Sequence, residues 1–193
     1  MNAKPSYLGL LNSIANGEAS AETYLEAWAC TTARDEVRQV ICAVAAREGE
    51  HGKAFAKRIN ELGFAVQTRS DGKEADRLAI ATSASLTDRE KFEKLGLGRA
   101  PDADKPDIFS RFLDDPTIDI ATGTLLGRYI SEERDSGRML RACYESLCCE
   151  EEMAGSPSGG TEQRLAALEE RLCRIETILE KLVDTTLVGS KRK

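Results

Sequence analysis

Between residues 35 and 62, apolar side chains recur every three or four positions, and this spacing constrains the fold more than any other feature of the chain. The period is typical of an amphipathic helix that buries one face. Two positions on that face are ionisable, Glu48 and His51, which are three residues apart and therefore neighbours on the helix surface. An unpaired buried carboxylate costs several kcal/mol even after relaxation, so Glu48 needs a positive partner inside the fold. The face comprises Val37, Ile41, Val44, Glu48, His51, Phe55, Ile59 and Leu62.

Two further helical segments show the same interruption of an apolar face by an acidic residue. In the segment 6–32 it is Glu18, and in the segment 117–151 it is Glu132, which has Glu133 as its rival. The rivals of Glu18 are Glu22 and Glu26. The apolar face of the segment 117–151 is predicted to comprise Ile118, Ala121, Leu125, Met139, Cys143 and Leu147.

A cation in the core would explain these interruptions. A metal ion can neutralise several carboxylates at once, and carboxylate oxygens with one imidazole nitrogen suit iron or manganese. The alternative is a buried ion-pair network with Arg128 or Arg138. The predicted metal ligands are Glu18, Glu48, His51 and Glu132.

The composition favours an all-α protein. Aromatic residues make up 5% of the chain and charged residues 31%, the net charge is −6 and the mean hydropathy is −0.38. An acidic surface is unsuited to nucleic acid, no apolar run approaches the ~20 residues that span a bilayer, and no secretion signal is recognisable. We therefore expect a cytoplasmic protein without nucleic-acid or membrane partners.

The cysteine pattern points to free thiols in a reducing compartment. There are six cysteines but no Cys-x-x-C pair, and Cys42 is expected to be a small core residue because it lies in an apolar stretch. A zinc site needs clustered Cys and His, and the chain has one histidine. We therefore expect neither a zinc site nor a disulfide framework.

Short helices are predicted between the long ones. One starts near residue 74 and is interrupted around residues 83–87. Thr87 and Glu90 have the spacing of a capping box, which predicts a second short helix that ends at Gly96. A third is expected from about residue 106 to the proline at position 116.

A linker, a coiled-coil helix and a basic tail are predicted after the last long helix. Residues 153–160 are rich in Gly and Ser, which is typical of a flexible linker. In residues 161–185, Leu or Ile recurs at alternating steps of three and four, the heptad pattern of a coiled coil. We therefore expect self-association through this helix, followed by a short basic tail at residues 186–193. The heptad residues are Leu165, Leu168, Leu172, Ile175, Leu179 and Leu182.

The motifs of the first half resemble those of the ferritin-like superfamily, and within it the rubrerythrin-like branch. They are Gly17-Glu18 with Tyr24 downstream, followed by Arg-Glu-Gly-Glu-His at residues 47–51. The resemblance implies a four-helix bundle over residues 1–152, in which glutamates and Glu-x-x-His motifs converge on a di-iron core. It also implies that Glu18, Glu48, His51 and Glu132 bind one or two iron ions, with manganese as the alternative metal.

The activity implied by this resemblance is that of an oxidoreductase. It would be an oxidase, a peroxidase or an iron-oxidising protein, and nothing in the sequence chooses among these. A rubredoxin-type Cys-x-x-Cys module is absent from the sequence, so peroxide reduction would need electrons from a partner protein. Tyr24 and Tyr129 are interpreted as packing residues near the site.

The second half of the chain departs from the family pattern. Where a second Glu-x-x-His is expected, residues 132–135 are Glu-Glu-Arg-Asp, so Asp135 stands at the histidine position. The third helix offers Ser85 and Asp88 but no central glutamate. These departures favour an alternative, a ferritin-like scaffold without catalysis that acts through coiled-coil oligomerisation or partner docking. A minor alternative comes from residues 186–192, which loosely resemble the C-terminal peptides that load cargo into encapsulin compartments.

Overall fold

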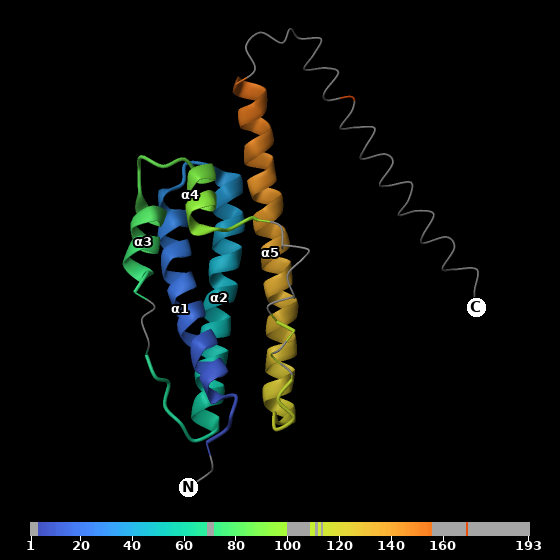
Figure 1. The fold of residues 1–193 in the computed structure, drawn as a ribbon. Coiled ribbons are helices and arrows are strands. Elements are labelled where there is room, and N and C mark those ends of the chain that lie inside the picture. Colours follow the sequence, from blue (N-terminus) through green and yellow to red (C-terminus); the bar gives the residue numbers. More distant parts are fainter. Residues whose placement is uncertain are drawn as a thin grey trace, which may run out of the picture. The chain divides into compact units, whose positions relative to one another are not determined.

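The structure, a computed structural model, describes residues 4–68, 72–99, 109–110, 112, 114–155 and 169. These residues form five helices and contain no strand, which confirms the all-α class (Figure 1). The helices are α1 (Leu8–Thr31), α2 (Asp35–Glu61), α3 (Glu74–Thr82), α4 (Asp88–Leu95) and α5 (Ile120–Gly155).

The chain divides into two compact units, Met1–Cys149 and Glu150–Lys193. In the second unit the structure describes residues 150–155, at the end of α5, and residue 169, all of them helical. α5 thus continues through the first three residues of the predicted linker. The predicted coiled coil, apart from that single residue, and the basic tail lie outside the described residues.

α1 and α2 form an antiparallel helical hairpin with a three-residue connection (Figure 1). Their buried apolar side chains belong to the same core clusters. The α2 face is buried as the sequence predicts, from Val37 through Glu48 and His51 to Ile59. A glycine in α2 permits this close packing, because a Cβ added to Gly52 would lie 3.3 Å from the backbone nitrogen of Ala19. The hairpin therefore holds Glu48 and His51 against α1.

α3 and α4 are short; α3 packs against α1, and α4 lies against both α1 and α5, with Tyr144 of α5 donating to Glu93 at 3.1 Å. The predicted capping box of α4 is confirmed, with both reciprocal hydrogen bonds between Thr87 and Glu90 present. Asp88 accepts hydrogen bonds from the Trp28 indole N–H at 2.7 Å and from the Thr32 hydroxyl at 2.6 Å. This acidic residue therefore joins α4 to the end of α1.

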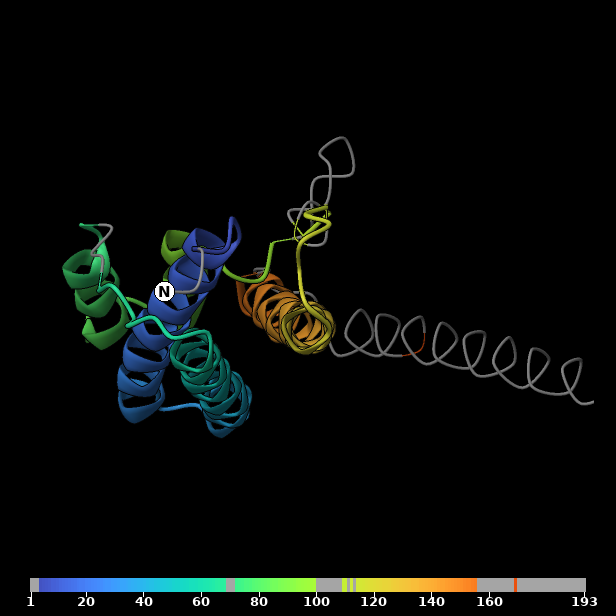
Figure 2. The same ribbon diagram turned by 90° about the horizontal axis from the view of Figure 1, so that it is seen from below.

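α5 runs beside α2 in both views of the ribbon (Figures 1 and 2). The predicted buried face of α5 is wrong by one residue in the first half of the helix: Ala121 is exposed and Leu125 half-buried, whereas Thr122 and Leu126 are fully buried. Near the end of the helix, Leu147 is buried as predicted. Apolar residues occupy two adjoining faces of this helix, and a shift of one residue rotates the face by 100°. The sequence pattern alone therefore does not fix which face turns inward.

Two apolar clusters fill the interior of the first unit, and a polar layer separates them along the three long helices. One cluster includes α1 up to Ala15, α2 from Phe55 onward and α5 up to Ile130. The other cluster includes α1 from Leu25 onward, α2 up to Ala45 and α5 from Leu140 onward. The intervening turns of all three helices carry the acidic residues and the histidine singled out above. The polar layer is therefore enclosed by apolar side chains on both sides.

Three further expectations concern the surface and the loops. Cys42 is exposed, so the expectation of a core residue is wrong, because the apolar stretch around it covers more than the buried face. The helix predicted from residue 106 falls largely outside the described residues, of which 109, 110 and 112 form turns. Among the helices that the structure describes, none is both long and apolar enough to cross a bilayer.

Candidate metal centre

Four side chains from three helices meet in the polar layer. Glu18 of α1, Glu48 and His51 of α2, and Glu133 of α5 each offer one ligand atom, and these atoms all lie within 4.8 Å of one another. Ligand atoms on opposite sides of one transition-metal ion are roughly 4 Å apart, because each bond to the metal is about 2 Å long. With small side-chain adjustments, the four atoms therefore have the spacing of a single coordination sphere.

The atoms that face one another in this group have no hydrogen-bond partner. They are Glu18 Oε2, His51 Nδ1 and Glu133 Oε1, and all three are inaccessible to solvent. Nδ1 lies 3.7 Å from Glu18 Oε2 and 3.4 Å from Glu133 Oε1, longer than an ordinary hydrogen bond. Buried polar atoms are nearly always paired, so three unpaired atoms converging on one point are characteristic of a cation-binding site.

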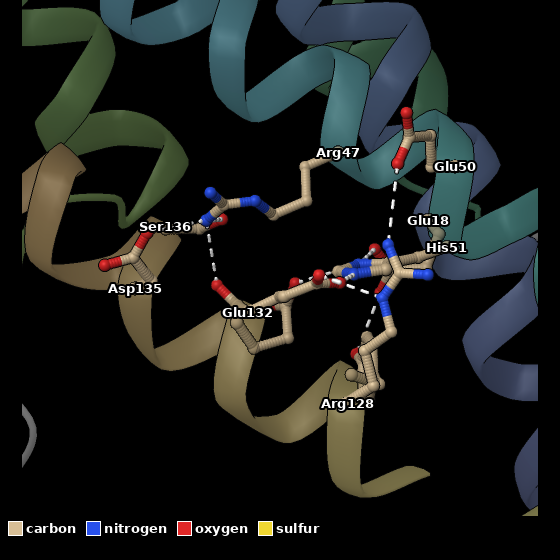
Figure 3. A network of polar contacts seen from close by, with 10 residues as sticks. Glu18, Arg47, Glu50, His51, Arg128, Glu132, Asp135 and Ser136 are labelled. Atoms are coloured by element: carbon tan, nitrogen blue, oxygen red, sulfur yellow. Dashed lines mark hydrogen bonds and ion pairs between the residues drawn. The ribbon is translucent and has the colours of Figure 1, made fainter. Parts of the chain in front are cut away.

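The opposite atoms of the same side chains are anchored. The Tyr129 hydroxyl donates to Glu18 Oε1 at 2.8 Å, and His51 Nε2 lies 2.7 Å from Glu132 Oε2 (Figure 3). Glu18 and His51 are thus each held through one atom and present the other to the group. Outer partners of this kind orient metal ligands and fix the histidine tautomer.

Electrostatics of the group favour a bound cation. Burial is the largest cause that raises the pKa of Glu48, and together with the neighbouring carboxylates of Glu18 and Glu133 it brings the value to about 10. Burial opposes ionisation of Glu18 as well, but contacts with His51, Glu48 and Tyr129 hold its pKa below the usual value. The pair therefore retains a proton near neutral pH, and a metal ion can replace that proton.

His51 is surrounded by carboxylates. Burial by itself would lower the pKa of its imidazole, but the nearby Glu133, Glu18 and Glu132 outweigh burial and raise the pKa to about 10. The imidazole is thus protonated in the metal-free protein, and its Nδ1 proton would leave when a metal binds. Among the described residues, no arginine or lysine forms an ion pair with Glu18, Glu48 or Glu133.

Glu132, which the sequence analysis predicts as a ligand, contacts the group from outside. Its Oε2 meets His51 Nε2, and its Oε1 accepts a hydrogen bond from Arg128 Nε at 2.9 Å (Figure 3). Arg128 also lies 3.7 Å from Glu50. The structure therefore places Glu132 behind the histidine, while its rival Glu133 offers the atom that faces Glu18 and His51.

Asp135, at the position of the expected second histidine, lies apart from the group. Its carboxylate accepts from Arg47 at 3.1 Å and from Arg138 at 2.9 Å. Arg47 Nη1 also donates to the backbone carbonyl of Glu132 and to the hydroxyl of buried Ser136 (Figure 3). Both arginines therefore bind this carboxylate. The contacts of Arg47 with Glu132, Asp135 and Ser136 link α2 to α5 and are called the clamp below.

The sequence analysis predicts that Glu18, Glu48 and His51 share one site, and the structure brings them together. The sequence alone assigns Tyr129 only a packing role. This tyrosine touches the site directly through Glu18. A signal for both Tyr129 and Glu133 exists in the series Thr122, Leu126, Tyr129, Glu133 and Ser136, which alternates steps of four and three. Half-buried Tyr24 is also influenced by the site: its burial and, next, the charge of Glu48 raise its pKa to about 12.

Comparisons of the chain with protein families, with curated proteins and with solved structures returned no match. The site is therefore interpreted from the chemistry and geometry of its own side chains. Three carboxylates and one imidazole form a set of hard and intermediate donors without sulfur. Such a set suits iron or manganese, whereas structural zinc usually takes cysteine.

Proposed function

We propose that this protein binds one transition-metal ion, iron, through Glu18, Glu48, His51 and Glu133. The observation that carries the proposal is the convergence of three buried atoms without hydrogen-bond partners, Glu18 Oε2, His51 Nδ1 and Glu133 Oε1. The charge of the group adds support. Three carboxylates with a neutral imidazole carry −3, so a trivalent ion neutralises them and a divalent ion leaves −1. Manganese satisfies the same donors and is the alternative metal.

A single ion is favoured over a pair by the side of the site that α5 forms. A second ion would need further ligands there, and the nearest candidate in the sequence, Asp135, is bound to Arg47 and Arg138. Glu132 is bound to His51 and Arg128. Both acidic residues already have positive or hydrogen-bonding partners, which supports one ion per chain.

A ferritin-like bundle and an oxidoreductase activity belong to the same proposal. Support for the bundle comes from the hairpin that places Glu18 opposite Glu48 and His51, and from the third carboxylate that α5 adds. α3 and α4, with nine and eight residues, stand where the chain order of such a bundle has one long helix. When bound, iron would supply one-electron redox chemistry toward dioxygen, peroxide or a small organic molecule, with electrons from a partner protein.

The test compares two glutamates of the same helix. Anaerobically purified protein is loaded with ferrous iron, freed of excess metal by gel filtration and analysed for iron per chain. We expect the wild type to hold one iron, Glu48→Gln to lose most of it and Glu50→Gln to retain it, because the Glu50 side chain is 72% exposed and lies against Arg128 instead of the four proposed ligands. A wild type that binds no metal, or a Glu48→Gln variant that binds normally, would contradict the proposal.

A scaffold without catalysis is the second candidate. It is supported by the burial of Glu48 beside Glu18 and Glu133, which raises the pKa of Glu48 to about 10, so that a proton would partly neutralise the group without any metal. In this case the protein would act through self-association of residues 161–185. Removing the chain after residue 155 should then lower the oligomeric state in light scattering, and iron analysis of the wild type would find none.

A further inference from the structure

The side chain of Tyr129 links the carboxylate of Glu18 to the aromatic part of the core. Its hydroxyl donates to Glu18 Oε1 at 2.8 Å, while Glu18 Oε2 has no hydrogen-bond partner and faces His51 and Glu133. We propose that Tyr129 is a positioning residue that sets how Glu18 coordinates metal. The phenol occupies one carboxylate oxygen, so Glu18 offers the ion only the other. This inference rests on the proposed metal site.

The ring of Tyr129 is held in place from several directions. Its centroid lies 5.0 Å from that of His51 and 5.2 Å from that of Phe55, both in edge-to-face geometry. Phe109 lies 6.0 Å away edge to face, and Phe112 stacks at 6.4 Å with an interplanar angle of 1°. Aromatic pairs prefer such arrangements. The hydroxyl is therefore fixed relative to Glu18, and with 7% of its surface exposed the tyrosine leaves water little access to that oxygen.

The hydroxyl remains a donor over the whole physiological range. Burial, followed by the charges of Glu18 and Glu133, raises the pKa of Tyr129 above its ordinary value. A neutral phenol donates its proton, and the 2.8 Å contact places that proton on Glu18 Oε1. Without the hydroxyl, Oε1 would be a buried oxygen without a partner. The nearest positive partner would then be the bound ion, and Glu18 would chelate it through both oxygens.

Tyr7 supplies a closely matched control. It is also 7% exposed, belongs to the same apolar cluster as Tyr129, and donates its hydroxyl to a carboxylate, Asp119 Oδ2, at 2.8 Å. Asp119 is bound by Arg58 and Thr122 and contacts none of the four ligand residues. A Tyr→Phe change at either position removes the same group from a similar environment, so only a role in the metal site separates their effects.

Cobalt(II) is the probe for this experiment, because its visible absorption weakens strongly as the number of its ligands increases. Metal-free full-length protein is titrated anaerobically with cobalt chloride, and the spectra of wild type, Tyr129→Phe and Tyr7→Phe are compared at saturation. With one ligand atom from each of four residues, we expect an intense visible band for the wild type. We expect a severalfold weaker band for Tyr129→Phe, as a second oxygen of Glu18 joins the ion, and an unchanged band for Tyr7→Phe.

Different results overturn different parts of the account. Superimposable spectra of wild type and Tyr129→Phe, or a band that weakens equally in Tyr7→Phe, would refute the positioning role while leaving the metal site intact. No cobalt binding by the wild type would refute the proposed function itself. Phenylalanine preserves the ring and its contacts, so folding should survive. Should Tyr129→Phe fail to fold, the wild type still provides a test, since the weak band of a six-coordinate ion contradicts the expected ion with four protein ligand atoms.

Discussion

The two sides of the proposed metal site differ in burial and in what holds them. On the hairpin side, Glu18, Glu48 and His51 are at most 7% exposed and belong to faces packed between α1 and α2. On the α5 side, the side chains of Glu132 and Glu133 are 29% and 20% exposed. Arginines surround the α5 side, whereas no arginine or lysine among the described residues pairs with the three hairpin ligands.

This difference indicates a division of labour. Packing fixes the three proposed ligands of the hairpin side without an ion, so under the proposal that side should determine whether metal binds. α5 also packs into both apolar clusters, but its polar side chains at the site are held by ion pairs that solvent weakens, so that side should modulate affinity and geometry. Substitutions on the hairpin side should accordingly have larger effects than substitutions on α5.

The largest effect is expected for His51→Ala. The variant removes the only imidazole of the chain, and Nδ1 is the atom that faces both Glu18 and Glu133. Metal affinity should fall by more than the roughly 10- to 100-fold that the loss of an outer partner costs. Titration with manganous ion followed by calorimetry measures this change, and circular dichroism verifies the fold. Unchanged affinity would show that the hairpin side does not bind the ion through its histidine.

A paired substitution on α5 should give the next largest effect and distinguish two adjacent residues. Glu133→Gln removes a ligand oxygen, whereas Glu132→Gln removes only the charge behind His51 and leaves an amide oxygen that can still accept from Nε2. We expect the second loss to be about 10-fold, as for an outer partner, and the first to be larger. The reverse order in the same titration would return Glu132 to the role of ligand.

Stability should depend on pH differently with and without metal. In the folded protein the pKa values of Glu48 and His51 are raised to about 10 from ordinary values of 4.5 and 6.5. The folded state therefore holds these protons more tightly than the unfolded state does. Their stabilisation is complete below the unfolded pKa and is lost as the pH rises toward the folded pKa.

Consequently, the Tm of the metal-free protein should fall between about pH 6 and about pH 9. The increase in Tm that manganous ion produces should grow over the same range, because the metal needs deprotonated ligands. Thermal unfolding by circular dichroism, with and without the ion, measures both trends. A metal-free Tm that rises with pH would mean that the buried group is ionised without metal.

The smallest effect is expected for Arg47→Ala, which breaks the clamp between α2 and α5. Buried Ser136 and the Glu132 carbonyl each lose a donor, so the free energy of unfolding should fall by about 1 kcal/mol. The exposed pair with Asp135 adds little. Urea unfolding measures the change, with Arg138→Ala as the control that removes only an exposed partner of Asp135. Equal effects of the two variants would exclude a special role for the clamp.

The contrast between the α1–α2 hairpin and α5 also explains which parts of the structure can be predicted from the sequence. On α2, the spacing of three and four residues runs through the whole helix and singles out one face, whose burial is predicted correctly from Val37 to Ile59. The α4 capping box is likewise local, because Thr87 and Glu90 satisfy each other's backbone. These features depend on periodicity and on contacts within a few residues, both of which can be read from one sequence.

α5 was predicted less well because its inward face is set by tertiary contacts. Two of its buried positions are Thr122 and Ser136, whose hydroxyls are paired with Arg58 and Arg47 of α2. Such polar residues do not look like core positions until their partners are known. Glu132 and Glu133 point 100° apart on the helix, so choosing between them requires knowing which face of α5 turns inward. Cys42 illustrates the converse, an apolar residue in a helix that the fold leaves at the surface.

The most direct test of the central claim is a crystal structure of protein loaded anaerobically with ferrous iron, with diffraction data collected on both sides of the iron absorption edge. The account predicts one anomalous peak per chain, bounded by Glu18 Oε2, His51 Nδ1 and oxygens of Glu48 and Glu133. Absence of a peak there, a second peak, or a peak between Glu132 and Asp135 would contradict it.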